Sequence, residues 1–186
     1  SQEEVDHGDE LVSRVVGMEG NGGKPLVVLH PFATHAAKQW PWERWEELVE
    51  MLDREGWRYI FIGKDSGPVP QWFGELGKER NLVNVLGLRQ SMGVMQAADL
   101  VVTGDSGPLH LARGLGVSVV ALFGPTDKAW GFYPEPEEGI VLERKLECRP
   151  CSLHGAGKCV RNMECLRGLT AETVFQAMQS VMGKEG

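Results

Sequence analysis

The sequence predicts an α/β fold in which βα units surround a parallel sheet, and three observations support it. Short runs of aliphatic and β-branched residues alternate along the chain with segments of helical periodicity. The 186 residues, 42% of them hydrophobic, suffice to bury the core of one domain. Two apolar runs end in glycine-containing turns, and open α/β sheets bind ligands at such strand ends. We therefore expect one domain with a ligand site at the carboxyl edge of its sheet.

The individual elements follow from local pattern. Apolar runs predict strands over residues 26–30, 58–63, 82–86, 100–103, 117–123 and 140–142. A helix is expected from Pro41, because proline and acidic residues favour a first turn. Its periodicity places one apolar face toward the core, formed by Trp42, Trp45, Leu48, Val49 and Leu52. Further helices are predicted over residues 71–79, 90–98 and 170–182, the last one capped by Thr170.

The first 24 residues differ from the rest in composition. They are acidic and then rich in glycine, which is typical of a linker or a flexible arm. We therefore expect an arm over residues 1–24 and the folded domain over residues 25–186. The N-terminus has no basic region followed by an apolar one, so we expect no secretory signal, and Ser1 in place of Met leads us to expect a processed or truncated chain.

Charge and hydropathy argue against two classes of protein. The formal net charge of -7 and the absence of a basic stripe argue against a nucleic-acid binder. The longest apolar stretches, such as residues 117–123, fall far short of the roughly 20 residues that cross a bilayer. We expect a soluble, cytoplasmic protein with at most peripheral membrane contact.

The turn GDSGP at residues 104–108 is the main candidate for a ligand site. It connects a predicted strand to a short helix entered through Pro108, an arrangement that directs backbone N–H groups and the positive helix end at one point. A second glycine turn, GPTD at residues 124–127, follows the next strand. Both turns should therefore lie at the same carboxyl edge of the sheet, and the first should bind phosphate.

Asp105 lies within the first turn and has two possible roles. A diphosphate would repel its carboxylate, so backbone donors or sugar hydroxyls are the expected partners. The alternative is that Asp105 caps the following helix. The loop after the first strand adds Thr34 as a hydroxyl donor and Lys38 as a cation suited to phosphate.

Four cysteines lie close together near the C-terminus, with the spacing C-x2-C-x7-C-x5-C. They are Cys148, Cys151, Cys159 and Cys165. In a cytoplasmic protein such density favours metal over disulfides, and four thiolates suit a structural zinc ion. His154 could replace one thiolate. Free thiols and disulfides remain alternatives, since only the first pair has a standard ligand spacing.

Several ordered blocks together resemble the C-terminal domain of the ADP-heptose lipopolysaccharide heptosyltransferases, glycosyltransferase family 9. They are His30-Pro31, Lys38 with Trp40-Pro41 and Trp45, and the segments at 98–102, 104–112 and 122–126. The resemblance implies a Rossmann-like doubly wound parallel sheet, one domain of a GT-B type glycosyltransferase, which binds a nucleotide sugar such as ADP-heptose.

The resemblance also implies roles for individual residues. Lys38 would contact the diphosphate and Asp105 the donor sugar, so that both stabilise the donor. Contacts with the phosphates and the sugar would come from the region of Ser106, Gly107 and His110. Thr34 matches one of two adjacent hydroxyl residues, while Ala33 replaces the other. Asp65, after Gly63 and Lys64, lies where the family has an acidic residue near the nucleoside.

The implied reaction is inverting transfer of the sugar, with a departing nucleoside diphosphate stabilised by helix N-termini and Lys38 rather than by a metal. The catalytic base and the glycolipid acceptor site belong to an N-terminal domain that this chain has no room for. We therefore expect donor binding without efficient transfer, for lipopolysaccharide or a related surface glycan. The alternatives are a regulatory nucleotide-binding module without catalysis and an interaction domain that uses the cysteine loop.

Overall fold

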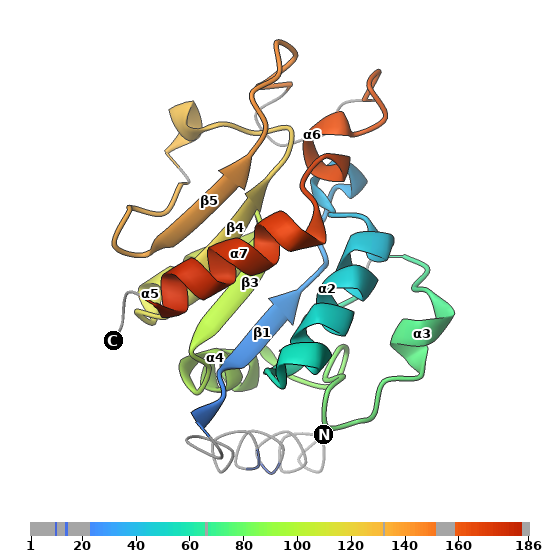
Figure 1. Cartoon of the computed structure of the whole chain (residues 1–186), viewed down its shortest axis with the longest axis vertical. Coiled ribbons are helices and arrows are strands. Elements are labelled where there is room, and N and C mark those ends of the chain that lie inside the picture. The colour runs from blue at the N-terminus through green and yellow to red at the C-terminus, as the bar shows by residue number, and fades with distance from the viewer. Residues whose placement is uncertain are drawn as a thin grey trace.

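The computed structural model describes residues 10, 14, 23–65, 67–131, 133–151 and 159–183. Nearly all of the arm predicted over residues 1–24 lies outside these described residues. Within them the chain forms a five-stranded sheet with helices on both faces (Figure 1). The predicted α/β fold is therefore confirmed.

The sheet is parallel throughout and has the strand order β2-β1-β3-β4-β5. The strands are β1 (Leu26–His30), β2 (Arg58–Phe61), β3 (Leu100–Gly104), β4 (Val119–Phe123) and β5 (Gly139–Glu143). The chain leaves β1 for β2 on one side and then crosses to β3 on the other. The sequential order thus reverses between β1 and β3, and doubly wound sheets bind ligands at such a switch point.

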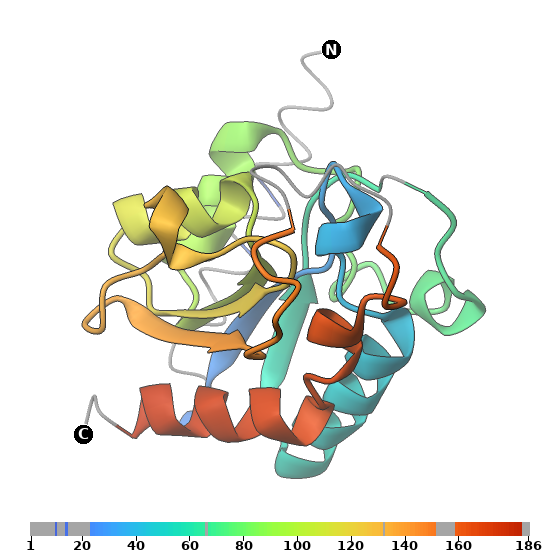
Figure 2. The same ribbon diagram turned by 90° about the horizontal axis from the view of Figure 1, so that it is seen from above.

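Helices cover both faces of this sheet (Figure 2). One face carries α2 (Trp42–Glu55), α6 (Glu164–Arg167) and α7 (Ala171–Met182), and the other carries α4 (Leu88–Gln96) and α5 (Gly107–Gly114). The short helices α3 (Gln71–Gly74), η2 (Ala36–Lys38) and η3 (Lys128–Trp130) lie in the connections. Alternate strand residues point to opposite sides, as a pleated strand requires. In β1, Val27 and Leu29 pack with α2 and α7, whereas Leu26 and Val28 pack with α4 and α5.

The predicted helix face of α2 does enter the core. Trp45, Leu48, Val49 and Leu52 are buried, while Trp42 is partly buried against the same cluster. Thr170 is the N-cap of α7, as expected, because its hydroxyl accepts a hydrogen bond from the Thr173 N–H at 3.2 Å. Since α2 and α7 pack against each other and against the sheet, they form one layer on this face.

Several predicted boundaries were wrong. Residues 82–86 do not form a strand: pairing is limited to a bridge between Phe61 and Asn81, and Asn84 has a φ of 63°, which an extended strand does not allow. Leu82 and Leu86 are buried all the same, so their apolar character reflects packing under a loop. The helix predicted over residues 71–79 ends at Gly74, and the one predicted over 90–98 spans Leu88–Gln96.

None of the helices within the described ranges has both the length and the apolar character needed to span a membrane.

Candidate functional site

Two loops meet at the switch point between β1 and β3. The loop after β1 carries Lys38, and the turn after β3 carries Asp105. The two side chains form an ion pair, with 2.6 Å between Lys38 Nζ and Asp105 Oδ2. Gly104 permits this approach, because a Cβ there would lie 3.0 Å from the backbone carbonyl oxygen of Lys38. The site is thus assembled by backbone packing as well as by charge.

Asp105 is 6% exposed and has a second partner from the next strand. Thr126, which is fully buried, donates its hydroxyl to the same Asp105 oxygen, Oδ2, at 2.7 Å. The N-cap of α5 is Ser106, whose side chain makes no capping hydrogen bond. Asp105 therefore does not cap α5, and the alternative that assigned it this role is wrong. Its carboxylate is instead oriented by Lys38 and Thr126.

A pocket of about 310 Å³ opens over this ion pair. All six residues that the sequence singled out for substrate binding line it: Thr34, Lys38, Asp105, Ser106, Gly107 and His110. Ala33 and His35 complete the lining. The structure therefore brings together residues that lie up to 76 positions apart in the chain, and their individual roles stay predictions.

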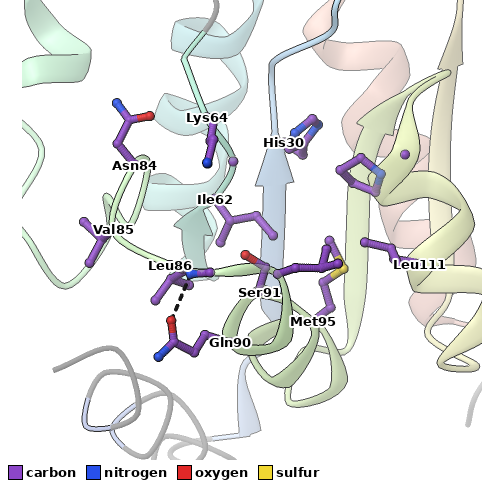
Figure 3. A pocket seen from close by; sticks show the side chains of 15 residues that line it. His30, Ile62, Lys64, Asn84, Val85, Leu86, Gln90, Ser91, Met95 and Leu111 are labelled. Atoms are coloured by element: carbon purple, nitrogen blue, oxygen red, sulfur yellow. Dashed lines mark hydrogen bonds between the residues drawn. The ribbon is translucent and has the colours of Figure 1, made fainter. Parts of the chain in front are cut away.

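A second and larger pocket has a volume of about 780 Å³ (Figure 3). Its lining comes from the segment after β2, which includes Gly63, Lys64 and Asn84, and from α4 and α5. Gly107 lines both pockets, so they adjoin at the start of α5. Asp65 is not part of this lining, and its backbone N–H donates to Asn84 Oδ1 at 3.1 Å. The acidic residue expected near the nucleoside is thus not among the residues that line either pocket.

His30 lies between the larger pocket and the first turn. Burial lowers the pKa of its imidazole to about 4, against a weaker opposing effect of a backbone hydrogen bond. The ring is therefore neutral at pH 7. Its Nδ1 lies 3.2 Å from the Thr103 hydroxyl, which in turn lies 3.2 Å from the Ser106 hydroxyl. A line of neutral polar groups thus connects His30 through Thr103 to Ser106 in the first turn.

The second glycine turn, at residues 124–127, lines neither of these two pockets. Gly124, Pro125 and Thr126 are buried, and only Thr126 reaches the site, through Asp105. Arg149 donates to the carbonyl oxygens of Gly124 and Thr126. Sequence reasoning assigned no role to Thr126 or Arg149, because neither contact follows from local spacing.

All four cysteines are free thiols in the structure. The pKa of Cys151 is raised, first by burial and then by the proximity of Cys148, Cys165 and Cys159. Across the part of the chain that the structure describes, no three or more His, Cys, Asp or Glu side chains form a group ready to hold a metal. His154 lies outside the described residues. Metal binding by the cysteines therefore stays a prediction.

Comparison with known proteins places the sequence beside one family of enzymes. The sequence profile of glycosyltransferase family 9 (heptosyltransferase) matches residues 4–155. The chain is 33% identical over 178 residues to lipopolysaccharide heptosyltransferase 2 of Salmonella typhimurium, covering 88% of this chain and 48% of the relative. It is 25% identical over 172 residues to lipooligosaccharide heptosyltransferase 2 of Haemophilus influenzae, covering 88% of this chain and 49% of the relative. The chain thus spans about half the length of these curated relatives.

Solved structures give the same fold. ADP-heptose lps heptosyltransferase II of E. coli superposes with a TM-score of 0.70 at 22% identity, covering 95% of this chain and 52% of that one. The dodecameric iron-containing heptosyltransferase TibC in complex with ADP-D-beta-D-heptose gives a TM-score of 0.69 at 19% identity, covering 88% and 46%. Since the family profile covers most of the chain and the fold agrees, this chain belongs to glycosyltransferase family 9.

Proposed function

We propose that this chain is the donor-binding half of an inverting, heptosyltransferase-like glycosyltransferase that binds a nucleotide sugar such as ADP-heptose. One observation carries the proposal: the six residues singled out from sequence line a single pocket at the switch point of a doubly wound sheet. The relatives are heptosyltransferases of lipopolysaccharide and lipooligosaccharide, which supports a role in making a surface glycan.

The two adjoining pockets suit the two ends of a nucleotide sugar. The larger, at about 780 Å³, is within the size range of small-ligand sites and would hold the nucleoside. The smaller would hold the sugar beside Asp105. The diphosphate would cross at Gly107, where the exposed start of α5 offers a positive helix end.

The ion pair explains how a carboxylate can lie next to a diphosphate. In the free site Lys38 and Thr126 both contact the Asp105 carboxylate, which reduces its repulsion of an incoming anion. On binding, the Lys38 ammonium would also attract the diphosphate and stabilise the charge that develops as the sugar departs. Asp105 would then accept from a sugar hydroxyl. The base that activates the acceptor, and the glycolipid acceptor site, would come from the rest of a longer protein.

The transfer that we propose uses Lys38 and α5 on the leaving group and requires no cofactor. The four cysteines would have a separate, structural role, in which Cys148, Cys151, Cys159 and Cys165 hold zinc. Iron is a second candidate ion, because one structural neighbour is described as iron-containing. Thiolate ligands suit both metals. We further propose that the parent enzyme acts at the cytoplasmic side of a membrane, with peripheral contact through its acceptor.

Calorimetry tests this function. The chain is titrated with ADP, UDP and GDP and with their sugar conjugates, and we expect saturable binding of one nucleotide family. Lys38→Ala should lower the affinity for free nucleoside diphosphates and for their sugar conjugates alike. Asp105→Ala should lower the affinity for the sugar conjugate more than the affinity for the free nucleotide. Lys78→Ala, at an exposed lysine that lines neither pocket, is the control and should leave both affinities unchanged.

The same titrations separate this proposal from its alternatives. A regulatory nucleotide-binding module would bind the nucleotides with no preference for the sugar conjugate. An interaction domain built on the cysteine loop would bind none of them. Absence of binding at millimolar ligand would thus exclude a donor site, and equal losses for both ligands in Asp105→Ala would exclude the assignment of Asp105 to the sugar.

A further inference from the structure

The cysteine-rich segment at residues 148–151 holds the second glycine turn through the turn's backbone. Three consecutive carbonyl oxygens of that turn each accept a hydrogen bond from this segment. Arg149 Nε donates to Gly124 O at 2.5 Å, the Cys151 N–H donates to Pro125 O at 2.8 Å, and Arg149 Nη2 donates to Thr126 O at 2.7 Å. One neighbouring segment therefore holds the first three of the turn's four residues.

Arg149 is well suited to this task. Its side chain is only 5% exposed, and its planar fork of donors can serve several acceptors at fixed angles. Nη1 donates to the Arg144 carbonyl at 2.6 Å, and Nη2 pairs with the Glu143 carboxylate at 2.7 Å. Burial alone would lower the pKa of Arg149, but hydrogen bonds and charge from Glu143 and Tyr133 raise it overall. The guanidinium is charged, and it donates to three carbonyl oxygens and to the Glu143 carboxylate.

A second contact restricts the turn at Gly124. A Cβ on Gly124 would lie 2.7 Å from Leu166 Cγ, and Leu166 is fully buried in α6. Gly124 thus has no space for an added methyl group beside Leu166. Such packing leaves the backbone at Thr126 little freedom to move.

Thr126 connects the second turn to the candidate site. Its hydroxyl donates to Asp105 Oδ2, the same oxygen that Lys38 contacts. Both contacts fall on Oδ2, so they hold the carboxylate in one orientation, and Oδ1 is the oxygen that we expect to accept from a ligand hydroxyl. The hydrogen bonds from Arg149 to Thr126 O and from Thr126 to Asp105 therefore form one continuous path.

We propose that Arg149 is a positioning residue for the donor site: it locks residues 124–126 so that Thr126 holds the Asp105 carboxylate toward the donor sugar. The inference rests on the proposed donor-binding function. In this proposal the cysteine-rich segment holds the second turn, whether or not its thiols bind a metal.

The test compares ADP-heptose with free ADP by calorimetry on the full chain and on Arg149→Gln. We expect the affinity for ADP-heptose to fall about tenfold, the equivalent of roughly one charged hydrogen bond, and the affinity for ADP to change by less than about twofold. A merely structural role would lower both affinities together or neither. Arg161→Gln, at a 45% exposed arginine of the same cysteine-rich region, is the matched control and should behave as the unchanged chain.

A double-mutant cycle tests the path itself. Thr126→Val should give the same selective loss, and the double variant should bind no worse than either single variant, because both changes break one path. Additive losses would overturn the inference, as would equal losses for both ligands in a folded Arg149→Gln protein. Failure of the unchanged chain to bind either ligand would instead defeat the donor site itself, and the inference with it.

Arg149→Lys keeps the test decisive if Arg149→Gln does not fold. Lysine retains the charge opposite Glu143 but loses the fork of donors that reaches both carbonyls. A selective loss for ADP-heptose is again expected. An unchanged ratio of the two affinities would show that charge alone suffices and would contradict a positioning role.

Discussion

The two glycine turns follow neighbouring strands and look alike in sequence, yet the structure uses them differently. In the turn after β3, Ser106 and Gly107 line the pockets. In the turn after β4, residues 124–126 are buried and line neither pocket. A glycine turn at the carboxyl edge of a parallel sheet therefore does not identify a ligand contact by itself. Whether another segment covers the turn decides between contact and support.

The chemistry beneath the two turns differs as well. The first contacts neutral groups through its Ser106 hydroxyl, namely Thr103 and, beyond it, His30, of which His30 can titrate. The second is held by a guanidinium that stays charged at any ordinary pH. Acid should therefore weaken the contacts that hold the first turn, because His30 takes up a proton. It should leave the contacts between Arg149 and the second turn unchanged.

The largest expected effect is a loss of stability in mild acid. The folded protein keeps His30 neutral down to about pH 4, whereas the unfolded chain takes up a proton near pH 6.5. The stability from this group is therefore complete above pH 6.5 and is lost as the pH falls toward 4. The difference between the two pKa values corresponds to about 3 kcal/mol of folding stability. Denaturant unfolding across this range measures it.

The matched variant for this experiment is His30→Gln, which cannot titrate. Carboxylates also titrate in the lower part of the range, so the difference between the two proteins isolates His30. The difference should shrink steadily from pH 6.5 to about 4. A difference that does not change with pH would mean that His30 is not kept neutral by burial.

The next largest effect on stability comes from adding a methyl group to one glycine in each turn, because the two glycines differ in the space around them. Gly124→Ala would bring a methyl group to 2.7 Å from the buried Leu166 side chain, whereas a Cβ on Gly107 meets nothing within 4 Å. We expect Gly124→Ala to destabilise the fold by about 1–3 kcal/mol through overpacking. Gly107→Ala should change stability by less than about 0.5 kcal/mol. Thermal unfolding of both variants checks this, and similar losses would remove the distinction between a covered and an open turn.

The smallest effect concerns the hydroxyl groups of the two turns. Thr126→Val removes the fully buried donor to Asp105 while keeping side-chain volume, and should cost about 1–2 kcal/mol. Ser106→Ala should cost less than about 0.5 kcal/mol, because Ser106 is partly exposed and makes no capping bond. Chemical denaturation gives both values. A Ser106 effect as large as that of Thr126 would show that the first turn is part of the rigid support.

The elements that the sequence predicted well are those with strong local patterns. The strands near Leu26, Leu100 and Val119 are continuous apolar runs, and Thr170 has the residue type of a helix cap. Residues 82–86 have a similar apolar content, but the positive φ at Asn84 turns the chain there. Short apolar runs cannot distinguish a strand from a loop packed on the core.

Much of the candidate site could also be predicted, for a topological reason. Strand ends of a parallel sheet meet at one edge, so the residues after β1 and β3 had to approach one another once the strands paired. This is why Lys38 and Asp105, 67 positions apart, could be placed together in advance. Their direct pairing was not foreseen, because it depends on how η2 packs against Gly104.

By itself the sequence determined the parallel α/β architecture, the family, and the set of residues gathered at the switch point, since all of these depend on periodicity and on motifs local to strand ends. Only the tertiary structure decided that Lys38 and Thr126 orient Asp105. It also decided that Arg149 locks the second turn, and that this turn supports the site without lining a pocket. The physical reason is that side-chain orientation and burial arise from contacts between segments distant in the chain. Such contacts leave no periodic signal in any one segment.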